Sequence, residues 1–145
     1  KNVKVIPSVN IPQGLSALLR LDPEGNLDEI ADEMVSALND VDAGEITTAT
    51  RTVELDGVDV EAGQIIGILN GKLVVSGDNV CDTTLSLLTK SNMDTKERVT
   101  LFTGNNLSED EINNTVSVIQ TRYPNHEVEI HEGGQPHYQF LISLE

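Results

Sequence analysis

The chain has 145 residues and a mass of 15.7 kDa, the size of one domain that can bury a core. Its 24 acidic and 9 basic residues give a formal net charge of −15, which repels phosphate backbones and anionic lipid headgroups and disfavours nucleic acid and membrane surfaces as partners. No apolar run reaches the roughly 18 residues that cross a bilayer, and the single cysteine, Cys81, excludes an intrachain disulfide. We therefore expect a soluble, cytoplasmic protein with no membrane insertion.

The first 44 residues are predicted to hold one strand and two helices. Residues 3–6 alternate valine, lysine, valine and isoleucine, which favours a strand that ends at Pro7. A short helix follows Pro12 and stops before Pro23, because proline suits a first helical turn and cannot continue a helix. Asn26 then caps an amphipathic helix that runs to a glycine at the end of the segment. Since the chain has no initiating methionine and opens on a strand, we interpret it as a single C-terminal domain fragment. Its first 44 residues would close a parallel α/β lobe whose start is missing.

The middle of the chain is predicted to form antiparallel hairpins. Asp56-Gly57 and Asn70-Gly71 are typical of two-residue hairpin turns, because both central positions of such a turn need positive φ. The strands are expected near 45–55, 58–60, 64–69 and 72–76. A helix capped by Asn79 follows and runs to Lys90, with Cys81 expected as a small buried thiol.

The last third is typical of a β-α-β unit. Residues 98–103 predict a strand, Ser108 begins a capping box for a helix that Pro124 terminates, and 127–130 predict a second strand. A Gly-Gly turn leads into a final strand at 140–144. Residues 45–145 are thus expected to form a mixed α+β lobe, and the fold class is α/β (α+β), with helices packed on a mixed sheet.

No recognisable catalytic site is present. The sequence has neither a P-loop nor a dinucleotide-binding glycine pattern, and Gly71-Lys72 lies in a hairpin turn rather than at the start of a helix. The three histidines fit no zinc spacing, and the acidic residues of 28–33 are interpreted as a solvated helix face. No nucleophile elbow marks a serine hydrolase. We predict no catalytic residue and no metal site.

Two loop segments stand out from this background. Residues 130–138 place two glycines, an amide, a proline and an aromatic between two strands, which either fixes a tight turn or leaves donors free for a ligand or partner. Residues 5–14 join a predicted strand to a helix N-terminus, where ligands collect in open α/β sheets. The candidate ligand- or partner-binding residues are Ser8, Gln13, Gly14, His131, Gly133, Gly134, Gln135, Pro136 and Tyr138.

The same segments carry a family resemblance. Residues 3–7 and 11–19, the middle stretches 56–58 and 71–77, and the tail 133–143 resemble, in this order, the C-terminal region of the kinase subunit of bacterial fatty acid kinase. That protein is dihydroxyacetone-kinase-like, and the resemblance covers essentially the whole chain. It implies a parent protein with an N-terminal kinase domain that binds ATP and Mg²⁺, a middle domain and this C-terminal domain. The segment itself would bind no cofactor.

The resemblance also implies a partner and a fold. The parent would phosphorylate a fatty acid presented by a DegV-like carrier protein, supplying acyl phosphate for phospholipid synthesis in Gram-positive bacteria. The C-terminal region is itself similar to part of the DegV fold, in which a turn histidine lies near the fatty acid carboxylate. His131 occupies the matching position, but the neighbouring Glu132 departs from the carrier's pattern and would disfavour a carboxylate ligand.

Three functions follow from these observations. The first is an interaction module that docks the carrier, or binds the rest of the kinase chain or a second copy, with the acidic surface facing a basic patch or serving solubility alone. The second is a fatty acid binding module that uses Ser8, Gln13, His131 and Gln135. The third, an enzyme in its own right, rests only on unassigned polar residues.

Overall fold

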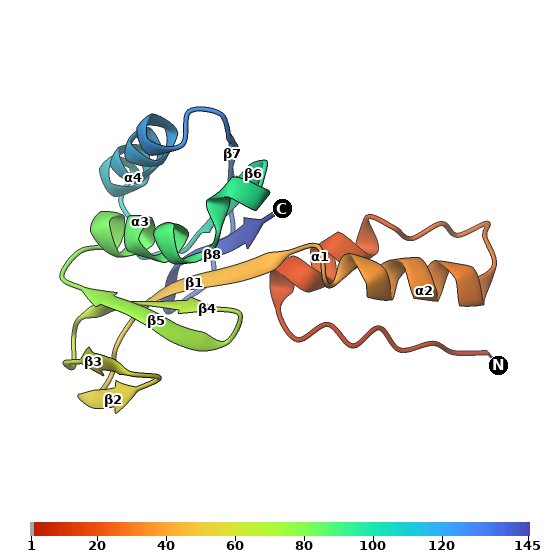
Figure 1. Ribbon diagram of the computed structural model, residues 1–145, viewed down its shortest axis with the longest axis horizontal. Coiled ribbons are helices and arrows are strands. Elements are labelled where there is room, and N and C mark those ends of the chain that lie inside the picture. The colour runs from red at the N-terminus through yellow and green to blue at the C-terminus, as the bar shows by residue number, and fades with distance from the viewer. Residues whose placement is uncertain (1) are drawn as a thin grey trace.

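A computed structural model describes residues 2–145 (Figure 1). Its helices are α1 (Ile11–Leu18), α2 (Leu27–Ala37), α3 (Val80–Lys90) and α4 (Glu109–Arg122), with a 3₁₀ turn at Met93–Thr95. Its strands are β1 (Asp42–Thr48), β2 (Val53–Leu55), β3 (Val58–Val60), β4 (Ile65–Leu69), β5 (Lys72–Gly77), β6 (Arg98–Thr103), β7 (Glu127–Glu132) and β8 (Tyr138–Leu144). Six strands form one sheet in the order β5-β4-β1-β8-β6-β7, and β2 and β3 form a separate pair. The predicted mixed α/β fold is confirmed.

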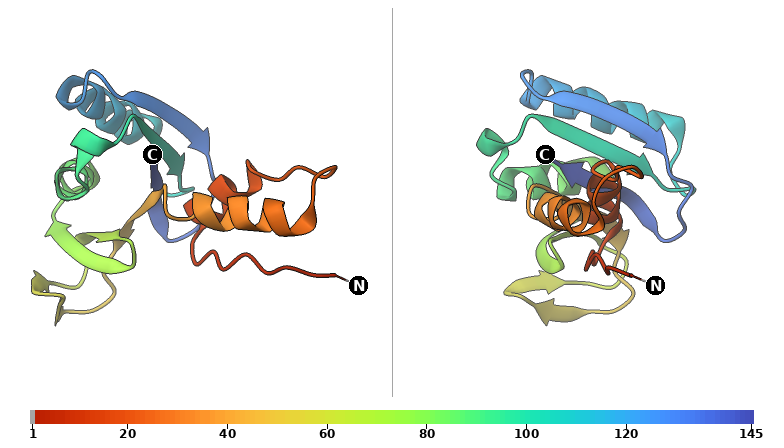
Figure 2. Two further views of the ribbon diagram at one scale, coloured as in Figure 1. Left: turned by 45° about the vertical axis from the view of Figure 1, so that its right-hand side comes forward. Right: turned by 90° about the vertical axis from the view of Figure 1, so that its right-hand side faces the viewer.

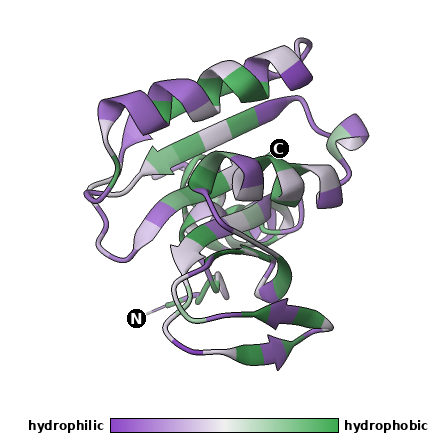
Figure 3. Ribbon diagram, turned by 90° about the vertical axis from the view of Figure 1, so that its left-hand side faces the viewer, coloured by the Kyte–Doolittle hydropathy of each residue, from purple (hydrophilic) through white to green (hydrophobic). Residues whose placement is uncertain are grey.

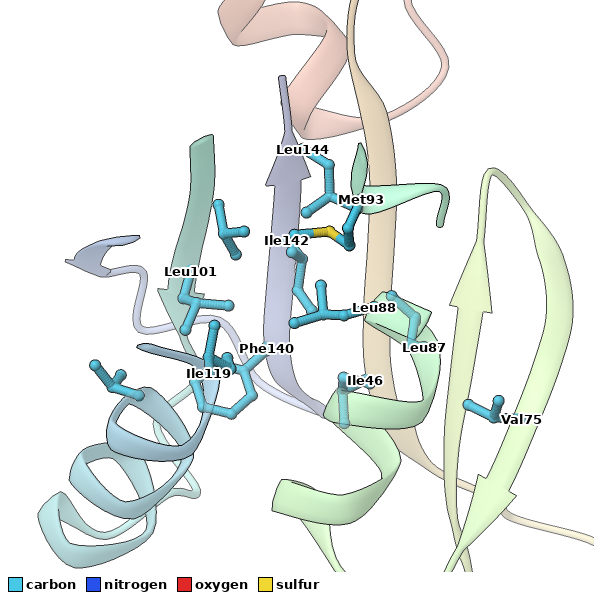
Figure 4. Close-up of a cluster of buried hydrophobic side chains, with 12 residues drawn as sticks. Ile46, Val75, Leu87, Leu88, Met93, Leu101, Ile119, Phe140, Ile142 and Leu144 are labelled. Atoms are coloured by element: carbon cyan, nitrogen blue, oxygen red, sulfur yellow. The ribbon is translucent and has the colours of Figure 1, made fainter. Parts of the chain in front are cut away.

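One face of the six-stranded sheet carries the core. Side chains alternate along a strand, so Ile46, Leu101 and Ile142 point to the same face, where α3 and α4 cover them (Figure 4). These three side chains, like Leu87 and Leu88 of α3, are fully buried. Aliphatic packing between two helices and one sheet face therefore holds the body together, as expected for a chain with few aromatic residues.

The two predicted hairpin turns are confirmed. Asp56 and Gly57 have φ of 54° and 79°, and Asn70 and Gly71 have φ of 49° and 80°, the left-handed pair that a two-residue turn needs. The single strand expected at 45–55 is wrong, because β1 ends at Thr48 and the chain bends before β2. The β2–β3 hairpin, on which hydrophobic and hydrophilic residues alternate (Figure 3), folds back to cover β4 and β5. Its contacts bury Ala49, Val60 and Leu73.

The predicted β-α-β unit is confirmed, and β6 and β7 pair in parallel. The Ser108 hydroxyl accepts from the Glu111 amide at 3.3 Å, and the Ser108 amide donates to the Glu111 carboxylate at 3.0 Å, which completes the capping box. Two strand bounds differ, since β7 continues to Glu132 and β8 already begins at Tyr138. Although β8 comes last in the sequence, it lies inside the sheet, between β1 and β6.

Residues 2–37 form an arm that projects from the sheet, as two views show (Figure 1, Figure 2). Within it, α1 packs on β1 and β8 and α2 packs on α1. The expected strand at residues 3–6 is wrong, because this segment runs beside α2 with no strand paired to it, and Lys4 forms an ion pair with Asp28. The expected parallel lobe at 1–44 stays a prediction, since it depends on chain outside these residues.

Two local expectations are also corrected. The second helix ends at Ala37 rather than at Gly44, which lies inside β1. A Cβ on Gly44 would lie 3.1 Å from Leu87 Cδ2 and 3.2 Å from Ile142 Cβ, so this glycine serves close packing of α3 on the sheet and not helix termination. Cys81 is half-buried rather than fully buried. Within residues 2–145, no helix combines the length and apolar character that crossing a membrane requires.

Candidate functional site

The site lies on the sheet face opposite α3 and α4, which we call the open face. The strand register places Glu45 of β1 beside Leu141 of β8, and Phe102 of β6 between Leu141 and His131 of β7. The β2–β3 hairpin covers one end of this face and α1 covers its middle, while the β6–β7 end is left without a covering helix (Figure 2). A groove therefore borders α1 on its β6–β7 side.

The two loop segments that the sequence singled out meet in this groove. A cleft of about 420 Å³, which we call the α1–loop cleft, separates the start of α1 from the turn after β7. Its walls are mainly apolar. It is lined by Val9, Asn10, Ile11, Pro12, Ala43, Glu45, Gln135, Pro136, His137, Tyr138 and Leu141. The structure thus brings three of the predicted residues, Gln135, Pro136 and Tyr138, into one site.

A second cleft, the α1–sheet cleft, continues from the first along α1 and has about 360 Å³. Pro12 contributes to both clefts. The side facing α1 is lined by Arg98, Thr100, Phe102, Glu129, His131, Ser143 and Glu145, and the helix side by Pro12, Leu15, Ser16, Leu18 and Leu19. The predicted residue His131 lies here, stacked on Phe102 with ring centroids 5.6 Å apart. It is therefore in a different cleft from Gln135.

The predicted residues at the start of α1 shape the helix entry instead of lining these two clefts. The Gln13 side chain accepts from the Val9 amide at 3.0 Å and donates to the Leu38 carbonyl at 3.4 Å, which ties α1 to the end of α2. Ser8 is exposed, and the Gly14 amide donates to the Asn10 carbonyl. The side-chain donors and acceptors of Gln13 are thus already engaged within the arm.

The turn after β7 is also internally bonded. The amides of Gly133 and Gly134 both donate to the Thr103 carbonyl, and Gly134 has a φ of 64°. Gln135 Nε2 donates to the Phe102 carbonyl at 2.8 Å, and a Cβ on Gly133 would collide with Gln135 Oε1. The tight-turn interpretation therefore describes this amide, which is not free to hold a ligand.

Arg98 marks the acidic end of the α1–sheet cleft. Its guanidinium lies 3.1 Å from Glu127, 3.8 Å from Glu129 and 3.9 Å from Glu145. The hydrogen bond to Glu127 and the charges of all three carboxylates raise the pKa of Arg98. One cation against three carboxylates leaves this end net negative, so it repels a carboxylate ligand.

Glu45 is the feature that sequence reasoning missed. Burial raises the pKa of its carboxyl, and among residues 2–145 no side chain forms an ion pair or hydrogen bond with it. Its neighbour Asp42 differs: burial would raise the pKa of Asp42, but bonds from Lys96 at 2.7 Å and Asn70 at 2.8 Å lower it overall. The signal for Glu45 was a single acid in an otherwise uncharged stretch of β1, Ala43 to Thr48.

The arm carries most of the exposed apolar surface. Among residues 2–145, ten of the twelve exposed large apolar side chains lie between Val3 and Val35. Val5, Val9 and Leu19 are each more than 80% exposed, at 82%, 85% and 81%. Contiguous apolar surface of this kind marks an interaction site in a folded protein. The described residues hold no group of three histidine, cysteine or acidic side chains placed to bind a metal.

Solved structures share this fold. The fatty acid kinase B3 protein of Streptococcus pneumoniae, solved with linoleic acid, matches 92% of this chain and 54% of its own, with a TM-score of 0.59 and 12% identity. A DegV family protein of Thermus thermophilus, whose structure concerns fatty acid binding, matches 92% of this chain and 55% of its own, with a TM-score of 0.55 and 12% identity. The predicted likeness to part of the DegV fold is confirmed.

Sequence relatives cover nearly the whole chain. Uncharacterised proteins of Staphylococcus haemolyticus and Staphylococcus aureus are each 36% identical over 141 residues, which is 97% of this chain. The chain spans only 26% of the length of these relatives. A family model for the C-terminal region of FakA-like fatty acid kinase proteins matches residues 1–145. The chain therefore belongs to the family of FakA-like C-terminal domains of fatty acid kinase.

Proposed function

We propose that this domain is a non-catalytic docking module that binds a DegV-like fatty-acid-carrying protein. A separate ATP-binding domain of the parent chain would then phosphorylate the fatty acid in the cytoplasm, with ATP and Mg²⁺ held by that domain. The observation that carries the proposal is the concentration of exposed apolar side chains on the arm, beside two open clefts. Surface of this composition gains free energy when a partner covers it.

The charge supports a protein partner with a basic surface. The chain has a formal charge of −15, and acidic side chains line the arm along α2 and the far end of the α1–sheet cleft. Complementary charge mainly speeds association and selects the partner, while apolar contacts supply most of the affinity. Docking is therefore expected to weaken as salt rises.

Calorimetric titration of this chain with the carrier tests the proposal. Replacing Leu18 and Leu19 by serine removes apolar contact from side chains that are 57% and 81% exposed, so binding should fall at least tenfold while the fold persists. Leu55→Ser on β2 is the matched control, because Leu55 is 52% exposed but lies on the hairpin at the other end of the open face. Equal binding by all variants, or full carrier binding by a parent chain without residues 1–145, would reject carrier docking.

Two other roles are outcomes of related measurements. Light scattering that finds a dimer of this chain, lost in the Leu18 and Leu19 variant, would assign the arm to self-association instead of carrier binding. Fatty acid binding is favoured by the apolar helix wall of the α1–sheet cleft and opposed by the three carboxylates around Arg98. Mass spectrometry of an organic extract of the purified chain decides it, since a bound fatty acid would be recovered in stoichiometric amount.

A further inference from the structure

The α1–loop cleft combines apolar walls with one carboxylate. Pro136 and Tyr138 of the turn and Leu141 of β8 line it, and Glu45 lies on β1 beside Leu141. Glu45 also lines an adjoining polar cleft of about 330 Å³. Its carboxylate therefore sits between two openings, where a side chain from outside can reach it.

We propose that Glu45 is the recognition carboxylate of the docking surface, and that it pairs with a lysine or arginine side chain of the carrier inserted into the α1–loop cleft. The proposal rests on the docking function above and specifies the chemistry of the contact. The apolar stem of the inserted side chain lies along Pro136, Tyr138 and Leu141, and its cationic head meets Glu45. Long basic side chains suit such a site because they carry an apolar stem behind a charged head.

Charge complementarity selects a cation over other occupants. Of the described residues that line the cleft, none is lysine or arginine, so the Glu45 carboxylate has no fixed cation to neutralise it. A half-buried, unpaired carboxylate loses hydration without compensation, and an incoming cation restores that loss. A fatty acid carboxylate would instead add a second negative charge beside the first.

The groups around Glu45 do not supply the missing charge. Asp42, three residues earlier on β1, is already paired with Lys96 at 2.7 Å, so that lysine is committed elsewhere. From the start of α1 the cleft receives only the uncharged Asn10, and β8 contributes only Leu141 and Tyr138. His137 of the turn is the one titratable base among the described residues that line the cleft, and it is exposed.

A pH dependence follows from burial. Because burial raises the pKa of Glu45, the carboxyl takes up a proton at higher pH than an exposed glutamate. Carrier binding should therefore weaken as the pH falls through this raised value. His137 becomes cationic over a higher pH range and, being a like charge to the inserted side chain, would weaken binding in the same direction. The variant His137→Gln separates the two groups.

The decisive experiment compares Glu45→Gln with Glu54→Gln in titrations with the carrier. Glu54 is an exposed glutamate on β2, outside both clefts, and serves as the matched control. Glu45→Gln should weaken binding about tenfold or more, which corresponds to about 1.4 kcal/mol, and Glu54→Gln should stay within about twofold of the parent chain. The effect should shrink at raised salt, and thermal unfolding should show that Glu45→Gln is no less stable than the parent.

A second measurement keeps the inference separate from the docking function. Carbon-detected NMR of labelled glutamate follows the Glu45 carboxyl while n-butylammonium or n-propylguanidinium, the two side-chain heads, is added. A saturable shift at Glu45 that is absent at Glu54 supports a cation site. If the carrier binds the parent chain and Glu45→Gln equally, the inference is overturned and docking stands. If the carrier does not bind at all, docking fails, and a missing probe shift then overturns the cation site as well.

Discussion

The contact of α3 with the sheet can be tested by a double-mutant cycle at Leu87 and Gly67. Leu87 is fully buried, and a Cβ on Gly67 would lie 3.0 Å from Leu87 Cδ1 and 2.6 Å from Val75 Cγ2. Leu87→Ala removes three carbons, about 2.4 kcal/mol by transfer at about 0.8 kcal/mol each, and the residual cavity brings the loss to about 3–4 kcal/mol. Gly67→Ala overfills the same space and should cost about 1–3 kcal/mol.

Combined, the two changes should partly compensate. The void left by Leu87→Ala gives the new methyl group and the Val75 side chain room to rearrange, so the double variant should lose about 1–2 kcal/mol less than the sum of the singles. Urea unfolding followed by far-ultraviolet circular dichroism measures all four proteins, since the chain has no tryptophan. Additivity within about 0.5 kcal/mol would show that Leu87 does not press on the sheet at Gly67, and the packing described for α3 would be wrong.

Three further stability predictions follow from local contacts. Ser108→Ala removes the capping box of α4 and should lower the free energy of unfolding by about 1 kcal/mol in the same urea assay, and an unchanged midpoint would contradict it. Gly104→Ala places a Cβ against the Tyr138 carbonyl oxygen and should cost more than about 2 kcal/mol, or prevent folding, as judged by thermal unfolding. Asp42→Asn should destabilise at neutral pH, because the bonds from Lys96 and Asn70 outweigh burial and lower the pKa of Asp42. This stabilisation is present above the unfolded pKa of about 3.9 and is lost as the pH falls through the folded value, so parent and variant stabilities should converge in acid.

Local signals in the sequence predict the hairpins and the β-α-β unit because their causes are local. A positive φ at Asn70 and Gly71 and the cap at Ser108 depend on residues within a few positions. The place of β8 between β1 and β6 depends on pairings across the whole chain, which no periodicity encodes. Gly44 misled for the same reason: a glycine after a helical pattern resembles a terminator, but tertiary contact with Leu87 explains it.

The site could be predicted only in part. The sequence correctly singled out the start of α1 and the turn after β7, and the α1–loop cleft joins them. It could not show that the Gln135 amide is spent on the Phe102 carbonyl, or that His131 lies in a separate cleft, since both facts depend on how two strands align. Glu45 was missed because an acid in a strand carries no signal until the lack of a cation around it is known.

The position of β8 bears on how the chain folds as it is synthesised. Until β8 is available, β5-β4-β1 and β6-β7 have no strand to join them, and β1 and β6 each present an unpaired edge. Phe140, Ile142 and Leu144, all fully buried in the end state, are also missing from the core during this interval. Open apolar edges are templates for pairing with other chains, so the nascent domain is most prone to aggregate just before its last strand leaves the ribosome.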